Sequence, residues 1–541
     1  MGTSEDLLLV NGSIYPMDPH YSVASALVVR EGRVLAVGGS ELRDFAGSDV
    51  RPVDLEGRCV LPGLTDSHVH FAGFALGLQK VDLAGTRSLE DALARVAERA
   101  AETPPGEWIE GRGWDQERWL DRRFPSATDL DRVAPRHLVA LTAKSGHVLV
   151  ANALALKRAD ITASTPDPNG GRIERDGAGN PTGLLFEEAM ELMRAAIPDP
   201  SAEEVIAVLP AAFERAWQVG LTGVHEMAVQ GVPDRVVFDA YQRLRARAEL
   251  RLRIVKYLPR EMLDHALALG MRSGLGDDWL RVGGIKVFVD GALGSHTAAM
   301  LEPYVGEPSN LGILITGQER LEELIRRATA GGLALAMHAI GDRANRMVLE
   351  ALTAARDAEG MTASDAPRHR IEHAQLLHPD DLGRVAELGA VASMQPVHAV
   401  QDAPMVDRYW GQRCTTAYAW RSLLDSGAVL AFGSDCPVED MNPFLGIQAA
   451  ATRVCPDGYG GSEGWHAEQR LTVEEAVRGY TSGAACAVGA EDRLGALAPG
   501  WWADLVVLDR DILTCDPAAI GETQVVGTMI EGRWVFGKWA A

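Results

Sequence analysis

The centre of this 541-residue chain alternates short apolar runs with helix-like stretches, and this alternation restricts the possible fold more than any other feature. The apolar runs are short enough, and bounded by enough glycine or helical sequence, to be strands buried on both faces. Strands that alternate with helices form parallel βα units, and eight such units close into a (β/α)8 barrel. We expect strands near residues 60–68, 221–226, 251–257, 281–290, 333–338, 369–373, 390–395 and 429–435.

Helical patterns fill most of the intervals between these runs. Residues 202–219 carry apolar side chains at the spacing of one helix face, and residues 320–329 and 380–388 are also predicted helices. Thr472 and Glu475 form a capping-box pattern that predicts a helix from there to about residue 480. The centre of the chain is therefore expected to be an α/β barrel of the TIM type.

Both ends of the chain are rich in predicted strands. These strands are residues 7–15, 24–30, 33–38 and 58–61 at the amino end and 504–508, 525–531 and 534–536 at the carboxyl end. We predict one small β-sandwich built from residues 1–60 and 486–541. Two independent hairpins that cap the barrel are the alternative.

The segment between the first barrel strand, at residues 61–70, and the rest of the barrel, at 201–485, is unusually long. Residues 71–200 far exceed an ordinary βα connection. They contain clustered tryptophan, arginine and proline, a Gly-His pair at 146–147 and a turn-rich patch at 167–171. We predict an inserted subdomain, which acts either as a substrate-recognising lid or as a packing or dimerisation element.

His68 and His70 stand two residues apart at the end of the first predicted barrel strand. Alternate side chains of an extended strand point to the same face, so both imidazoles are directed to one place. Neutral imidazole is a common ligand of zinc and similar metals. Taken alone, such a pair also fits two buried histidines that only form hydrogen bonds.

Four more groups that can bind metal or transfer protons lie at or near the ends of other predicted strands. They are Lys286, His338, His373 and Asp435. In parallel barrels the carboxyl ends of the strands surround one pocket. We therefore predict that these four side chains and the two histidines of the first strand meet at one site.

The same segments resemble the amidohydrolase superfamily, and specifically its YtcJ-like branch, which includes the N-substituted formamide deformylases. The resemblance covers nearly the whole chain, with its motifs in the expected order. The matching motifs are residues 62–70 (PGLTDSHVH), 286–295 (KVFVDGALGS), 338–342 (HAIGD), 370–373 (RIEH), 433–435 (GSD) and 494–509 (LGALAPGWWADLVVLD). The family pairs the barrel with a small β-sandwich, as the strand pattern also suggests.

The resemblance implies two divalent metal ions, expected to be zinc, and a bridging lysine that has reacted with CO2 to form a carbamate. One ion would be held by His68, His70, the carbamylated Lys286 and Asp435, and the other by His338, His373 and the same Lys286. An unpaired ammonium would be costly to bury in the apolar strand of Lys286. A lysine paired with Asp290 or Asp435 beside a single metal is the alternative.

This ligand set predicts hydrolysis. A divalent cation lowers the pKa of water and polarises a carbonyl, and Asp435 is the expected general base, which accepts a proton and passes it to the leaving amine. We expect metal-activated hydroxide to cleave a non-peptide C–N bond in an N-acyl or N-formyl amide of a small molecule. An esterase, lactonase or carbamate hydrolase on the same centre is the nearest alternative. A catalytically silent scaffold and a nucleobase deaminase are further alternatives.

Several other residues are candidates for substrate binding. They are Trp114, His147, His225, Asp290 and His296. His225 fits a satisfied core histidine equally well, and Asp290 could instead support Lys286. His296 departs from the family, whose members usually carry arginine there, which puts an anionic-substrate preference through that position in doubt. Asp342 and Glu372 flank two of the histidines and are expected to orient them or neighbouring loops.

Composition restricts partners and location. The net charge of −23 and the lack of a basic stripe argue against nucleic acid as a partner. Six scattered cysteines without a Cys-x-x-Cys motif indicate a reduced, intracellular protein. The acidic amino terminus does not resemble a signal peptide, and no apolar stretch reaches the ~20 residues that span a bilayer. We expect a cytoplasmic protein, with a homodimer left open.

Overall fold

The computed structural model describes residues 6–18, 23–47, 50–120, 122–144, 147–168, 170–228, 232–360 and 367–540. Residues 1–5 of the amino terminus, Gly146 and Asn169, on which some of the expectations depend, lie outside the described residues. The chain divides into two compact units. One is formed by Met1–Phe74 and Leu209–Ala541, and the other by Ala75–Val208.

Eight parallel strands form the barrel of the larger unit. In pairing order they are β6 (Leu64–Val69), β13 (Leu221–Glu226), β14 (Arg253–Pro259), β15 (Leu280–Phe288), β16 (Leu335–Ala339), β17 (Arg370–His373), β18 (Val391–Met394) and β19 (Val429–Phe432). The predicted α/β barrel is confirmed. The first strand begins later than expected, because Leu61 and Pro62 pair with a carboxyl-terminal strand outside the barrel.

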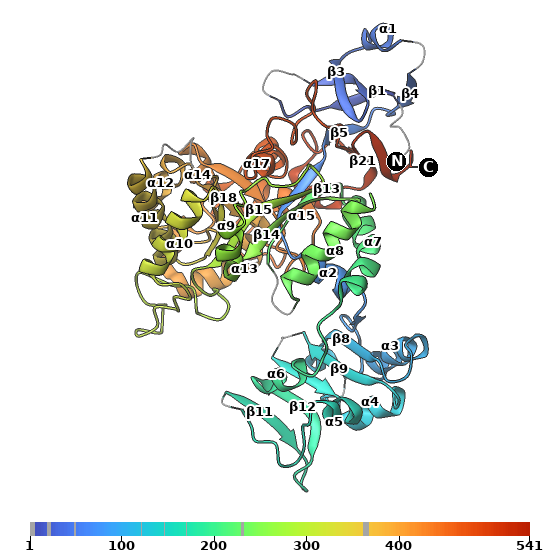
Figure 1. The fold of residues 1–541 in the computed structure, drawn as a ribbon, viewed down its shortest axis with the longest axis vertical. Helices are drawn as coiled ribbons and strands as arrows, with labels where there is room; N and C mark the ends of the chain where they lie inside the picture. The colour runs from blue at the N-terminus through green and yellow to red at the C-terminus, as the bar shows by residue number, and fades with distance from the viewer. Residues whose placement is uncertain are drawn as a thin grey trace. The chain divides into compact units, whose positions relative to one another are not determined.

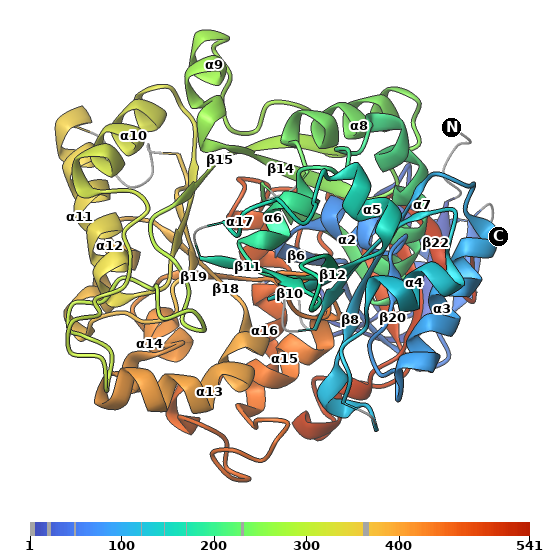
Figure 2. The same ribbon diagram turned by 90° about the horizontal axis from the view of Figure 1, so that it is seen from below.

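Helices cover the outside of the barrel (Figure 2). They are α7 (Ala202–Gln218), α8 (Asp234–Ala246), α9 (Leu263–Ala268), α10 (Gln318–Ala330), α11 (Asp342–Glu359), α12 (Leu382–Glu387), α13 (Pro396–Trp410), α14 (Trp420–Asp425), α15 (Pro443–Thr452), α16 (Val473–Gly479) and α17 (Ser482–Cys486). The capping box of α16 is present, with the Thr472 and Glu475 side chains each bonded to the other residue's backbone. The predicted helix over 380–388 divides into a 3-10 turn at Pro379–Asp381 and α12.

The barrel closes where its last strand meets its first. The Asp435 backbone N–H donates to the carbonyl of His68 at 2.7 Å, and the His70 N–H donates to the carbonyl of Cys436 at 2.8 Å. The buried Asp66 carboxylate accepts from the backbone N–H groups of His68 and Ser434, both at 3.0 Å, and from the Ser434 hydroxyl. The seam therefore fixes the backbone from which three of the candidate ligands project.

Strands from both ends of the chain form one further sheet, in the order β22-β21-β20-β5-β1-β2-β3 with β4 beside β1 (Figure 1). Their bounds are β1 (Leu7–Ile14), β2 (Ala24–Arg30), β3 (Arg33–Gly38), β4 (Arg51–Asp54), β5 (Cys59–Pro62), β20 (Leu505–Leu508), β21 (Val525–Ile530) and β22 (Arg533–Gly537). Because β5 pairs with both β1 and β20, two independent hairpins are ruled out. The strand β4 was missed by the sequence analysis.

This terminal sheet folds over on itself. The Ala503 N–H donates to the carbonyl of Gly32 at 2.9 Å, and the Gly532 N–H donates to the carbonyl of Ala503 at 3.0 Å. Both glycines have positive φ, and a Cβ atom on Gly532 would lie 2.9 Å from the Gly32 Cα. A shared apolar core holds side chains from both ends, including Leu27 and Val507. Both ends of the chain thus build one unit around a shared core, as expected, but its strands form a single folded sheet instead of two separate ones.

The second compact unit contains a six-stranded sheet in the order β11-β12-β10-β9-β8-β7 (Figure 1). Its strands are β7 (Val81–Asp82), β8 (Trp108–Trp114), β9 (Leu138–Ala143), β10 (Val148–Ala151), β11 (Gly171–Arg175) and β12 (Pro181–Glu187), and its helices are α3 (Leu89–Glu102), α4 (Ala127–Val133), α5 (Ala153–Arg158) and α6 (Ala189–Arg194). Two separate apolar cores, one with Leu93 and Val139 and one with Leu149 and Met190, fill it. The insertion predicted at 71–200 thus has its own hydrophobic interior.

Two expectations from composition concern the cysteines and membrane-spanning helices. The six cysteines form no disulfide within the part of the chain that the structure describes. None of the described helices combines the length and apolar character needed to cross a membrane.

Candidate metal centre

Four imidazoles, a lysine amine and a carboxylate gather at the carboxyl ends of the barrel strands. They come from β6 and the residues after it, β15, β16, β17 and the residues after β19, and are His68, His70, Lys286, His338, His373 and Asp435. The His68 and His373 rings are 4.8 Å apart between centroids, and the His338 and His373 rings are 4.6 Å apart. The structure therefore brings together side chains from five strands.

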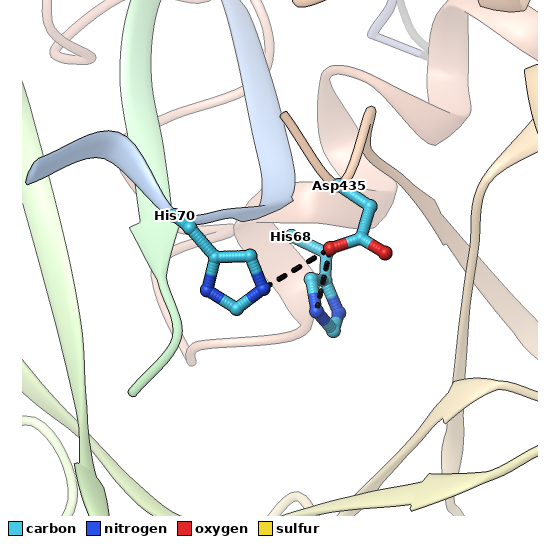
Figure 3. A group of neighbouring side chains, drawn as sticks. All are labelled: His68, His70 and Asp435. Atoms are coloured by element: carbon cyan, nitrogen blue, oxygen red, sulfur yellow. Dashed lines mark ion pairs between the residues drawn. The ribbon is translucent and has the colours of Figure 1, made fainter. Parts of the chain in front are cut away.

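Asp435 faces the two histidines of the first strand (Figure 3). Its Oδ1 lies 3.2 Å from His70 Nε2 and 3.6 Å from His68 Nε2. Burial raises the pKa of this carboxyl, but His70 and the neighbouring histidines outweigh burial and hold the pKa well below its usual range. Asp435 and His373 both adopt left-handed backbone, with φ of 60° and 72°, a conformation that costs free energy in non-glycine residues and is common at functional sites.

Three of the imidazoles have one ring nitrogen held by a neighbouring acceptor. His68 Nδ1 lies 2.5 Å from Glu372 Oε2, and His373 Nδ1 lies 2.8 Å from Gln395 Oε1. His338 Nε2 lies 3.0 Å from the carbonyl oxygen of Gly291. An acceptor on one nitrogen fixes the tautomer and leaves the other nitrogen unprotonated, which is how metal-binding histidines are oriented.

Several buried polar atoms of this cluster have no hydrogen-bond partner among the described residues: His70 Nδ1, His398 Nε2 and Lys286 Nζ. Two groups of ligand atoms lie within 4.8 Å of one another: His68 with His70 and Asp435, and His373 with His398 and Asp435. Buried polar atoms are normally satisfied, so exceptions call for an explanation. Oriented imidazoles, a carboxylate and these unsatisfied atoms fit a divalent cation.

Lys286 is buried inside this cluster. Its ammonium forms no hydrogen bond with Asp290, Asp435 or any other described residue, and the choice between a bridging carbamate and a paired lysine beside one metal stays a prediction. Burial lowers the pKa of Lys286 to about 8, against the opposing charges of Glu372 and Asp435. Burial, followed by the charge of Lys286, lowers the pKa of His338 to about 3. A cationic Lys286 therefore favours the neutral form of the His338 imidazole, which is the form that binds a metal.

Glu372 has the orienting role that its position suggested. Burial raises the pKa of its carboxyl, but the charges of Arg370 and His68 outweigh burial and hold the pKa well below its usual range. Arg370 Nε donates to Glu372 Oε1 at 2.5 Å. Asp342 has the other expected role, because its carboxylate holds neighbouring backbone by accepting from the N–H groups of Leu301 and Arg343.

His398 is a member of the cluster that the sequence analysis missed. It lies in the first turn of α13, and its Nε2 is 3.9 Å from Asp435 Oδ2. Its ring stacks on His373 with centroids 6.2 Å apart. The available signal was Gln395-Pro396-Val397-His398 directly after the seventh barrel strand, where a helix start places its first turn beside the strand ends.

Two of the five predicted substrate-binding residues lie in the second compact unit. Trp114 is 1% exposed in the core of that unit, packs against Trp119 with tilted rings and donates to the carbonyl of Leu141, so the prediction that it lines a pocket is wrong. Large aromatic side chains usually pack in hydrophobic cores of this kind. His147 is exposed beside Glu187, at 2.9 Å, and its contribution to a substrate site stays a prediction.

The other three candidates belong to the barrel unit. His225 is 2% exposed, and its Nδ1 lies 2.9 Å from Arg370 Nη1, so it is a satisfied core histidine. Asp290 accepts from three backbone N–H groups, of Ala299, Ile340 and Gly341, and so holds loops rather than Lys286. His296 is partly exposed, lies 2.6 Å from Glu307 and stays a candidate.

A barrel with oriented imidazoles and a carboxylate at its strand ends defines the class of metal-dependent hydrolases. The model described as "Amidohydrolase family" matches residues 51–536. This chain therefore belongs to the amidohydrolase family.

Relatives of similar length support the assignment. Protein LONG AFTER FAR-RED 3 of Arabidopsis thaliana is 36% identical over 99% of this chain and 92% of its own length. Putative amidohydrolase YtcJ of Bacillus subtilis is 34% identical over 97% of this chain and 98% of its own length. N-substituted formamide deformylase of Arthrobacter pascens is 29% identical, covering 98% of each chain. The expected resemblance to the YtcJ-like branch is confirmed.

A solved structure shows the same architecture. The crystal structure of an uncharacterized metal-dependent hydrolase from Pyrococcus furiosus superposes with a TM-score of 0.78 and 31% sequence identity. The match covers 94% of this chain and 100% of that chain.

Proposed function

We propose that this metal-dependent hydrolase cleaves a non-peptide C–N bond, in an N-acyl or N-formyl amide of a small molecule. The observation that carries the proposal is the convergence of oriented imidazoles, a buried unpaired lysine and the Asp435 carboxylate at the strand ends. The formamide deformylase named among the relatives supports this bond type. The small molecule would enter at the end of the barrel where these side chains meet.

The donor set suits two zinc ions. His68, His70 and Asp435 would hold one, His338 and His373 the other, and Lys286 would bridge both as a carbamate. The carbamate forms when the lysine nitrogen bonds to the carbon of CO2 and the ammonium releases two protons, which replaces a buried cation with an anion. When bound there, the metal lowers the pKa of water and polarises the substrate carbonyl.

Asp435 supplies the proton transfer. Its carboxylate, beside both histidines of the first strand, accepts a proton from the attacking water and delivers it to the departing nitrogen, which leaves as a neutral amine. His398 Nε2 lies 3.9 Å from the second carboxylate oxygen of Asp435. Hydrolysis of an ester, lactone or carbamate would depend less on this proton transfer, since an alkoxide is a better leaving group than an amide anion.

Replacement of Asp435 by asparagine tests the role of general base. We expect Asp435→Asn to lower kcat by about 100-fold or more on N-formyl and N-acyl amides, because a general base contributes about that factor. Asp425→Asn, at an exposed pair with Arg421, is the matched control and should keep full activity. Amide and ester substrates of equal shape measured side by side separate the two activities.

Two outcomes contradict the proposal. If Asp435→Asn retains activity close to that of the wild-type protein, then Asp435 is not the base. If esters are hydrolysed and none of the amides is, then the bond type is wrong. Elemental analysis of the same samples shows whether Asp435→Asn keeps its metal, as we expect for a residue whose main contribution is proton transfer.

A further inference from the structure

A second group of possible metal ligands lies outside the strand-end cluster. Asp407 belongs to α13, Cys414 to the 3-10 turn Gly411–Thr416, and His466 precedes the 3-10 turn Ala467–Gln469. One ligand atom from each lies within 4.8 Å of the others. The group shares no residue with the cluster proposed to hold the catalytic metals.

His466 is oriented in the way that metal-binding histidines are. Its Nδ1 lies 3.2 Å from Glu468 Oε1, and its ring packs edge-on against Trp465 with centroids 4.5 Å apart. Its Nε2 is buried, has no hydrogen-bond partner among the described residues and lies 4.0 Å from Asp407 Oδ1. A carboxylate on one nitrogen and an unsatisfied second nitrogen directed at another ligand is the arrangement expected beside a cation.

The Asp407 carboxylate is oriented by three neighbouring side chains. The Tyr459 hydroxyl donates to Oδ2 at 2.8 Å, and Trp465 Nε1 lies 3.1 and 3.2 Å from the two oxygens. The Cys414 thiol is the third hydrogen-bond partner. A carboxylate has about four lone-pair positions, so three donors leave one position for a cation, and the thiol proton is lost when zinc binds.

Cys414 supplies the third donor. Its sulfur lies within 4.8 Å of the Asp407 and His466 ligand atoms. A bound cation deprotonates a coordinating thiol. Sulfur, imidazole nitrogen and carboxylate oxygen together suit zinc, whereas calcium and magnesium prefer oxygen alone.

We propose that Asp407, Cys414 and His466 form an additional zinc-type site with water as fourth ligand. Ligand atoms of tetrahedral zinc lie about 3.4 Å apart, so the 4.0 Å between His466 Nε2 and Asp407 Oδ1 needs only a small side-chain adjustment. When zinc binds, a sulfur–zinc bond forms and the thiol proton passes to solvent.

The position of the site suggests what occupancy does. It links α13 to the segment 455–466, whose Gly458, Gly460, Gly461 and Gly464 all have positive φ. The other end of α13 carries His398, beside Asp435. A cation at Asp407 would therefore anchor a glycine-rich loop to the helix that contributes to the strand-end cluster.

Cobalt substitution tests the site directly. We expect full-length protein, stripped with a chelator and titrated with Co²⁺, to develop the near-ultraviolet charge-transfer band of a cobalt–thiolate bond. The band should be lost in Cys414→Ser and strongly weakened in His466→Ala. Cys515→Ser, at another partly exposed cysteine, is the matched control and should keep the band. Zinc added in excess should abolish the band by displacement.

Two results would overturn the site. One is a thiolate band that persists in Cys414→Ser, since another cysteine would then be the ligand. The other is a wild-type protein without the band at Co²⁺ concentrations that fill its imidazole and carboxylate sites. Circular dichroism of each stripped variant shows that it is folded, and because the band reports sulfur ligation alone, the result is independent of the hydrolase reaction.

Discussion

At the scale of single residues, Gln395 shows how an uncharged neighbour orients a histidine of the cluster at the strand ends. Its amide oxygen holds His373 Nδ1 at 2.8 Å, as the Glu372 carboxylate holds His68. Unlike Glu372, Gln395 has no charged partner. Its replacement therefore changes the orientation of His373 without leaving a buried charge unpaired.

We predict that Gln395→Ala lowers metal affinity by about 10–100-fold, the usual effect of losing such an orienting partner. Competition with a chromophoric chelator measures this. Gln242→Ala, on the exposed face of α8, is the control and should bind metal normally. Unchanged affinity in Gln395→Ala would show that His373 does not depend on this bond.

A second prediction at this scale concerns Lys286. If its amine is converted to a carbamate, protein stripped of metal at low CO2 should regain full activity only when zinc and bicarbonate are added together. Zinc alone should restore a small fraction. Equal recovery with and without bicarbonate, measured in CO2-free buffer, would contradict the carbamate bridge.

The sequence predicts which residues belong to the cluster when those residues end a strand. It does not predict the residues that only tertiary packing brings there. His338 and Asp435 follow apolar runs, which fixes their place at the barrel mouth. His398 was missed because it lies on a helix, and only the packing of α13 brings it to Asp435. Trp114 was misjudged and His225 was left open between two roles, because residue type alone does not separate a pocket-lining ring from a core ring.

At the scale of elements, Arg370 on β17 ties the interior of the barrel together. Its guanidinium donates to the carbonyl of Ser67 and to the Ser393 hydroxyl, both at 2.6 Å, and contacts His225 at 2.9 Å. These partners belong to β6, β18 and β13, so one fully buried side chain joins strands across the barrel. Glu372 neutralises its charge.

We predict that Arg370→Met lowers the free energy of unfolding by about 3–5 kcal/mol, because Glu372 is left as an uncompensated buried charge. The double variant Arg370→Met/Glu372→Met should recover part of this loss, since apolar replacements of buried pairs are often tolerated. The metal affinity of the double variant should stay low, because His68 loses the Glu372 carboxylate that accepts from its Nδ1. Urea denaturation provides the measurement, and a fully stable Arg370→Met would contradict the argument.

The ends of a strand can be predicted from the sequence only where one neighbouring strand, and not two, can pair with the segment. Most barrel strands lie within a few residues of their expected positions. The exception is the segment from Cys59 to Val69, which the structure divides between β5 and β6. Gly63 marks the division, because a Cβ there would lie 2.3 Å from the Thr222 side chain. Nothing local in the segment reveals which residues pair with β20.

At the scale of the whole molecule, the two compact units have separate hydrophobic interiors. The length of the stretch after the first barrel strand predicted an insertion. Its observed end, at Val208, falls inside α7, which continues from one unit into the other. A helix without a break gives no sequence signal for such a boundary.

We predict that the units unfold in separable calorimetric transitions, as multidomain chains commonly do. Leu141→Ala, in a core of the second unit, should lower one transition, and Ile285→Ala, in the barrel, should lower the other. Each truncation should cost about 2–5 kcal/mol. A single transition shifted equally by both variants would show that the units unfold together.

The seam between β19 and β6 has a consequence for how the protein is made. Ser434 and Asp66, which bond across it, are separated by 368 residues. At roughly 5–20 residues per second, ribosomes need on the order of 20–70 s to span that interval. A nascent chain thus exposes its first pair of histidines long before the aspartate that completes the centre emerges, and cellular metal can reach a finished pocket only late in translation.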